Sequence, residues 1–123
     1  MTKAGALHAF FNSFGIPFYP SSSVPEDTIF PWGTYDAVFG AWGDEPIAIT
    51  ANLWYRTESE KEPNDKIKQI SAAVGLGGKI VLFDEGAIWI KRGEPFVQNL
   101  SDETDDLIKR RYINLTVEYL TIN

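Results

Sequence analysis

The stretch from Ile47 to Gly75 constrains the fold most, because a strand pattern is followed by a helix pattern within it. Between Ile47 and Arg56 every second residue is apolar, and side chains two residues apart point to the same side of a strand. These apolar positions are Ile47, Ile49, Ala51, Leu53 and Tyr55. The pattern therefore predicts a long strand with one face in the core and the other in contact with water.

A helix is expected directly after this strand. Pro63 suits a first helical position, where no amide hydrogen is needed, and Asn64 and Asp65 favour the positive end of a helix. The apolar residues that follow at helical spacing are Ile67, Ile70 and Val74. Gly75 is expected to end the helix as a left-handed cap. One strand with one helix packed across it would form the core.

Length and composition limit the class of protein. A chain of 123 residues suits a single domain spanning 1–123, with enough residues for its own core. The chain has no cysteine, no membrane-length apolar run and no secretion-signal pattern, so we expect a cytoplasmic origin and no membrane partner. The net charge of −6 opposes non-specific binding to nucleic acid, and four tryptophans suggest contact with a protein partner.

The segments before the central strand predict a helix, a loop and a hairpin. Thr2 can cap a helix with an apolar stripe, which Gly15 and Pro17 end. The stripe consists of Leu7, Phe10, Phe11 and Phe14. The segment from Ile16 to Pro31 has four prolines and a serine triplet, which favour a long loop. Residues 32–42 alternate again, and a turn at 43–46 would pair them with the central strand as a hairpin.

The segments after the central helix predict a second hairpin and a last strand. Residues 79–83 and 87–92 flank a turn at 84–86. The acidic segment Gly93 to Lys109 is expected to be irregular, with a short helical turn beginning near Ser101. Tyr112 to Ile122 has apolar residues on both faces, which indicates an interior strand or a subunit contact. The predicted class is α+β, with a mostly antiparallel sheet of about five strands and both helices packed on one face.

Few residues suggest chemistry. His8 is the only histidine, so one chain cannot form a histidine triad or a multi-histidine metal site, and a structural role is favoured. The glycines before Lys79 follow a helix instead of opening one, which favours a turn over a phosphate loop. Asp84 and Glu85 are interpreted as turn residues rather than paired catalytic carboxylates. We therefore expect no catalytic residue and no cofactor.

One acidic cluster has two interpretations. Its members are Asp102, Glu103, Asp105 and Asp106. Carboxylates suit calcium or magnesium, but the spacing lacks the central glycine and terminal glutamate of a calcium loop. A solvated negative patch is favoured over a metal site. The adjacent Lys109, Arg110 and Arg111 are expected to pair locally with these acids.

Two parts of the chain resemble a known family. The first is Phe30-Pro31-Trp32-Gly33-Thr34-Tyr35, which resembles the aromatic-Pro-aromatic strand entry of small tail-completion proteins of long-tailed bacteriophages, with Trp32 where tyrosine is common. The second comprises Asp84 to Phe96, DEGAIWIKRGEPF, and Arg111 to Leu120, RYINLTVEYL. It is similar to tail-terminator or minor capsid proteins of prophages in Gram-positive bacteria. The order helix, hairpin, helix, hairpin, last strand is shared across nearly the whole chain.

The resemblance implies a structural virion protein with no enzymatic activity. Such subunits form a ring, commonly a hexamer, at the head-proximal end of the tail tube, and they join the tube protein to the head-completion proteins. Assembly would take place in the cytoplasm of the bacterial host, and DNA would pass through the ring without specific binding. The alternatives are another phage neck or minor capsid protein, and a small-molecule-binding or hydrolytic α+β domain whose site only folding assembles.

The two long polar segments, 16–31 and 93–109, are the expected joining surfaces. The interface anchors predicted there and at the first hairpin are Phe18, Tyr19, Phe30, Trp32, Phe96 and Leu100. The alternative is that the loop anchors fold back onto their own core. The acidic residues Asp102, Glu103, Asp105 and Asp106 are expected near the lumen of the ring, and the outer rim is equally compatible with the sequence.

Overall fold

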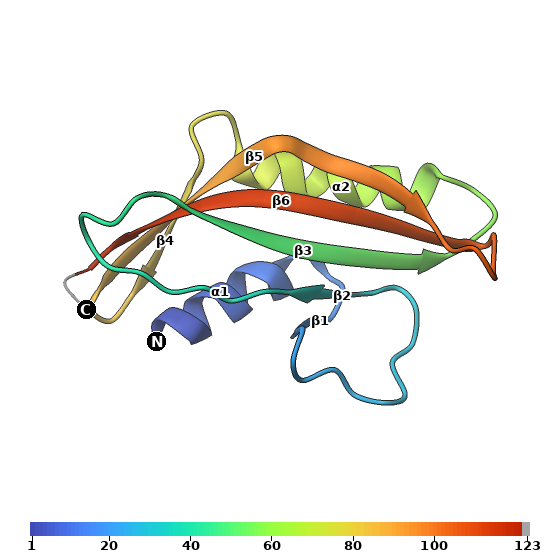
Figure 1. The fold of residues 1–123 in the computed structure, drawn as a ribbon, viewed down its shortest axis with the longest axis horizontal. Helices are drawn as coiled ribbons and strands as arrows, with labels where there is room; N and C mark the ends of the chain where they lie inside the picture. The colour runs from blue at the N-terminus through green and yellow to red at the C-terminus, as the bar shows by residue number, and fades with distance from the viewer. Residues whose placement is uncertain (122–123) are drawn as a thin grey trace.

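The computed structural model describes residues 1–121 and contains one six-stranded sheet within them (Figure 1). The elements are α1 (Lys3–Phe11), the 3₁₀-helix η1 (Asn12–Phe14), β1 (Phe18–Pro20), β2 (Trp32–Tyr35), β3 (Ile47–Arg56), α2 (Lys61–Val74), β4 (Lys79–Phe83), β5 (Gly86–Ser101) and β6 (Ile108–Leu120). The strand order is β1-β2-β3-β6-β5-β4, and only the β1–β2 pair is parallel. The α+β class is confirmed, with six strands instead of about five.

The centre of the sheet is the antiparallel pair of β3 and β6. Its register runs without a break from Ile47 opposite Val117 to Arg56 opposite Ile108. The predicted alternation in β3 is confirmed, and so is the interior position of the last strand; Ile122 lies outside the described residues. The buried apolar side chains of β3, β5 and β6 share one side of the sheet, called here the inner face. They are Ile49, Ala51, Leu53, Tyr55, Ile88, Ile90, Ile113, Leu115, Val117 and Tyr119.

The helix ends follow local hydrogen bonding. The Thr2 side chain accepts a hydrogen bond from the Gly5 amide at 3.0 Å, which confirms the predicted cap of α1. Helix α2 begins at Lys61, two residues before Pro63, and the missing amide hydrogen costs little because first-turn amides have no helical partner. The predicted left-handed cap at Gly75 is wrong: φ is +73°, but ψ of 176° sends the chain out in an extended direction.

The helices and the inner face share one hydrophobic core. Buried residues of α1, η1 and α2 form a single cluster with the inner face, and α2 runs beside β5 and β6 (Figure 1). The helical members are Ala6, Leu7, Phe10, Phe11, Phe14, Ile70 and Val74. Burying an apolar side chain of this size contributes about 1.5–3 kcal/mol, so most of the stability originates here. No helix within residues 1–121 is long and apolar enough to span a membrane.

Two predicted segments before β3 have a different structure. The expected loop 16–31 contains strand β1, because Asn12 of η1 holds Phe18 through hydrogen bonds to its amide and its carbonyl, both 3.0 Å long. The expected hairpin strand 32–42 ends at Tyr35, and residues 36–46 are irregular. Tyr119 explains this second difference, since its hydroxyl donates to the Val38 carbonyl at 2.6 Å and its ring contacts Phe39.

Strand β5 is longer than predicted. The β4–β5 hairpin with its turn at Asp84 and Glu85 is confirmed. The break expected at Gly93 is only a register shift between Arg92 and Val97, after which β5 pairs with β6 as far as Ser101. The helical turn expected after Ser101 is absent from the described residues, because residues 102–107 form a tight reversal.

Candidate functional site

The most distinctive surface of the subunit is a row of side chains across four strands. Register places Trp32 opposite Trp54, Trp54 opposite Arg110, and Arg110 opposite Leu100. Directly opposed residues point to the same side of a sheet. These four side chains, called here the outer-face row, therefore lie on the face opposite the core.

The outer-face row is ordered by its own contacts. The rings of Trp32 and Trp54 stack with centroids 4.4 Å apart and planes 20° from parallel. The guanidinium carbon of Arg110 lies 5.8 Å from the centroids of both Trp54 and Tyr112, within cation–π range. Its Nε donates to the Asn52 side-chain oxygen at 2.8 Å. The row therefore presents a flat aromatic surface and one positive charge in defined positions.

Both tryptophans are half-buried, and Leu100 is 40% exposed. Beside the row is a hollow of about 100 Å³ lined by Trp54, Ser101, Asp102, Ile108 and Arg110. A side chain of another protein fits a space of this size better than a substrate does, since ligand pockets measure about 300–1,000 Å³. The row has the residue types that dominate protein interfaces, namely tryptophan and arginine.

The structure separates the predicted interface anchors. Trp32 and Leu100 belong to the outer-face row, and Tyr19 lies on the same face, opposite Thr34. Phe30 is exposed and immediately precedes Pro31 and β2.

The other two predicted anchors, Phe18 and Phe96, pack onto the subunit's own core, which is the alternative that the sequence left open. Phe18 is 1% exposed and packs against Phe11 in the core. Phe96 is partly buried against the same core, beside the Arg92 guanidinium. Neither side chain is displayed on the surface with the outer-face row.

The acidic cluster forms the tight loop between β5 and β6. Asp102 accepts hydrogen bonds from the amide and hydroxyl of Thr104 and from the amide of Asp105, and these bonds lower its pKa. Asp105 accepts from the Leu107 amide and from Arg56, at 3.0 Å in each case, and its pKa is lowered by the same two contacts. These two carboxylates therefore shape the loop.

The remaining two acids of the cluster, Glu103 and Asp106, are exposed at the loop. Within residues 1–121 no group of three or more histidine, cysteine or acidic side chains is arranged to hold a metal ion.

The other candidate residues have structural contacts. The Nδ1 atom of His8 lies 3.0 Å from the hydroxyl of Tyr35, whose pKa is raised by burial. The glycines before Lys79 form the turn between α2 and β4, where the indole of Trp89 donates to the Gly77 carbonyl at 2.8 Å.

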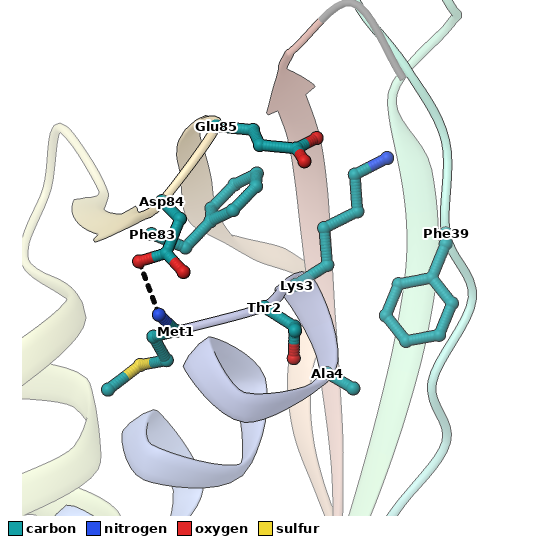
Figure 2. A pocket seen from close by; sticks show the side chains of 8 residues that line it. All are labelled: Met1, Thr2, Lys3, Ala4, Phe39, Phe83, Asp84 and Glu85. Carbon is teal, nitrogen blue, oxygen red and sulfur yellow. Dashed lines mark hydrogen bonds and ion pairs between the residues drawn. The ribbon is translucent and has the colours of Figure 1, made fainter.

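A larger cleft lies where α1 begins (Figure 2). Its volume is about 430 Å³, and it is lined by Met1, Thr2, Lys3, Ala4, Phe39, Phe83, Asp84 and Glu85. The N-terminal amine forms an ion pair with Asp84, whose amide donates back to the Met1 carbonyl. The Lys3 ammonium donates to the Gly40 carbonyl at 2.7 Å. The lining of the cleft thus combines apolar side chains with charged groups.

The sequence pattern does not identify Trp54 as a site residue, and it predicts only local pairing with acids for Arg110 and Arg111. Trp54 is an aromatic residue on the polar side of an alternating strand, and that placement was the available signal for an outer-face contact. Arg111 was expected to pair with nearby acids, but it is 1% exposed and forms an ion pair with Glu60. It also donates to the Asn64 side chain at 2.9 Å, which ties the start of α2 to β6. No pattern in sequence order connects residues 60 and 111.

No protein-family model, no curated protein and no solved structure matches this chain.

Proposed function

We propose that this chain is the tail-terminator subunit of a long-tailed bacteriophage. In this proposal about six copies form a ring at the head-proximal end of the tail, between the major tail tube protein and the head-completion proteins, and the role is structural and not enzymatic. The observation that carries the proposal is the outer-face row, in which two stacked tryptophans and an arginine are held in place on an uncovered sheet face. Such residues dominate the binding energy of protein interfaces.

The arrangement of the two helices supports this use of the outer face. We place both α1 and α2 on the inner face, because their buried residues share one cluster with it. The outer face is then free for a neighbouring subunit or tube protein over most of its width.

A closed ring needs two different patches that fit each other. The outer-face row is one of them in this proposal. The loop 21–31 is the second patch, because two of its apolar residues reach the surface: Ile29 is 82% exposed and Phe30 is 36% exposed. Exposed apolar side chains on a polar loop can insert into a pocket of the adjacent subunit. Residues 21–31 thus keep the predicted joining role, whereas Ile16 and Phe18 are buried in the core.

In this proposal the acidic loop faces the lumen of the ring. The long β5–β6 hairpin carries this loop at its tip (Figure 1). Glu103 and Asp106 are exposed on the loop. A net charge of −6 per chain becomes −36 over six copies. Basic residues would retain phosphates by releasing counterions, whereas acids let DNA pass.

The test is electron microscopy of tails assembled with wild-type protein, without it, and with Trp54→Ala. Tails lacking the protein should have irregular length or fail to join heads, and Trp54→Ala should reproduce much of that defect. The matched control is Trp42→Ala, since Trp42 is 67% exposed in loop 36–46 and outside the row. Tails of normal length that join heads in the absence of the protein would contradict the assignment.

The cleft at the start of α1 favours a second candidate, a small-molecule-binding domain. Its volume of about 430 Å³ lies within the range of ligand sites. NMR titration with small apolar carboxylates is the test, with Phe39→Trp as a variant that fills the cleft. Saturable shifts confined to lining residues and lost in Phe39→Trp would favour this candidate.

A further inference from the structure

The two edges of the sheet differ in whether they can accept another strand. At the β1 edge, the side chain of Asn12 occupies both outward backbone groups of Phe18, accepting from its amide and donating to its carbonyl. The next outward residue, Pro20, has no amide hydrogen to offer. The β1 edge is therefore closed by the subunit itself.

The β4 edge is open from Lys79 to Phe83, and the next outward amide, that of Asp84, donates to the Met1 carbonyl. Every second residue of a strand at an antiparallel edge points its amide and carbonyl away from the sheet. Within residues 1–121, the only backbone partner of Lys79–Phe83 is β5. Ile80 is 50% exposed, Leu82 is 73% exposed, and nearby Leu76 is 98% exposed. An edge with unpaired backbone groups and exposed apolar side chains is suited to accepting a strand.

We propose that β4 pairs with β4 of a second copy of this chain, antiparallel and around a two-fold axis at Val81. The closed β1 edge excludes pairing of β4 with β1 of another copy. The two sheets would join into one continuous sheet. This interface is separate from the outer-face row, and it does not rest on the proposed tail function.

The register follows from overlap and charge. Only a two-fold axis at Val81 overlaps all five residues of both strands, and it places Ile80 opposite Leu82 of the other copy. Cross-strand apolar pairs of this kind stabilise a sheet. The one charged residue of the strand, Lys79, then lies opposite Phe83 and beside the turn that carries Asp84 and Glu85. No like charges therefore face each other in the paired strands.

Sedimentation equilibrium on the full chain tests the pairing. Wild-type protein should approach twice the mass of one chain as its concentration rises. Ile80→Lys should weaken this association by about tenfold or more, since a charge placed opposite Leu82 loses the apolar pair. The control is Glu58→Lys, which also places a lysine at an exposed position; it lies between β3 and α2, at the other end of the sheet from β4 (Figure 1), and should leave association unchanged. A wild-type monomer at all concentrations, or equal effects of both variants, would overturn the proposal.

Engineered cysteines test the register, because the natural chain has none. Ile80→Cys and Leu82→Cys variants are oxidised separately and as a mixture. The predicted register aligns residue 80 with residue 82, so the mixture should cross-link faster than either variant alone. Equal rates in all three samples would overturn the register. Tail assembly is measured with Trp54→Ala, so failure of the strand pairing and failure of the tail function are distinguished.

Discussion

Arg110 and Arg111 are adjacent in the chain and lie on opposite faces of β6. Arg110 is half-exposed on the outer face, between Trp54 and Tyr112. Arg111 is 1% exposed on the inner face, paired with Glu60 at the start of α2. The same residue type thus ties α2 to β6 on one face and belongs to the proposed interface on the other, and we expect substitutions on the two faces to separate stability from assembly.

The largest effect is expected at the inner pair. Glu60→Ala leaves the Arg111 guanidinium buried without its carboxylate and should lower the free energy of unfolding by about 3 kcal/mol. This is the lower end of the range for a broken buried pair, because the Glu60 side chain is 54% exposed and Asn64 remains as a partner. Urea denaturation measures the loss.

The control for this change removes both charges. The double variant Glu60→Gln with Arg111→Met leaves no buried charge, so it should recover most of the stability lost in Glu60→Ala. An equal loss in both variants would show that packing, rather than the unpaired charge, is responsible.

On the outer face we expect a smaller loss of stability and a larger loss of tail assembly. Trp54→Ala removes the stack with Trp32 and should cost about 2 kcal/mol, below the value of about 3–5 kcal/mol for a fully buried aromatic residue. Its effect on tail assembly should exceed that of Glu60→Ala when both variants are folded. If Glu60→Ala impairs assembly more at equal folded fraction, the two faces are not specialised in this way.

A smaller effect concerns Tyr119 on the inner face. Burial raises its pKa from 10.0 to about 12, so the folded state favours the neutral phenol. This stabilisation is complete below pH 10 and is lost as the pH rises through about 12. Tyr119→Phe also removes the hydrogen bond to Val38 and should cost about 1 kcal/mol at neutral pH.

Denaturation at a series of alkaline pH values measures both parts of the Tyr119 prediction. The wild-type protein should lose stability more steeply than Tyr119→Phe above pH 10, the ordinary pKa of tyrosine. Parallel curves for the two proteins would contradict the assignment of this slope to Tyr119.

The smallest change in stability is expected at the acidic loop. Glu103→Lys with Asp106→Lys should alter the free energy of unfolding by less than about 0.5 kcal/mol, because both side chains are exposed. In virions the same variant should slow DNA release, since basic residues in a lumen retain phosphates. Asp102→Asn is the contrasting variant: it alters the hydrogen bonds of the loop without adding positive charge. Unchanged release with the lysine variant would place the loop away from the lumen.

The strands and helices that depend on periodic burial were predictable from the sequence. Ile49 to Tyr55 alternate because one face of β3 is in the core, and Phe10 and Phe14 recur at helical spacing for the same reason. Apolar periodicity is a local property, and it determined the α+β class and the central strands.

Tertiary contacts decided the segments where local signals were weak or misleading. Asn12 makes residues 18–20 a strand, although prolines and serines there favour a loop. Tyr119 holds Val38 and ends the strand that alternation extended to Trp42. Pairing with β6 carries β5 past Gly93, where composition predicted a break. The second and third outcomes depend on a partner distant in sequence, whereas the first depends on a side chain six residues away that no periodic pattern indicates.

The candidate surface was predictable only in part. Trp32 and Leu100 are predicted as interface anchors, but their alignment with Trp54 and Arg110 depends on the register of four strands. The sequence by itself determined which residues alternate between core and solvent, because burial of apolar side chains follows the period of each element. Only the tertiary structure decided which of them meet across strands, because register is set by pairing between segments far apart in the chain.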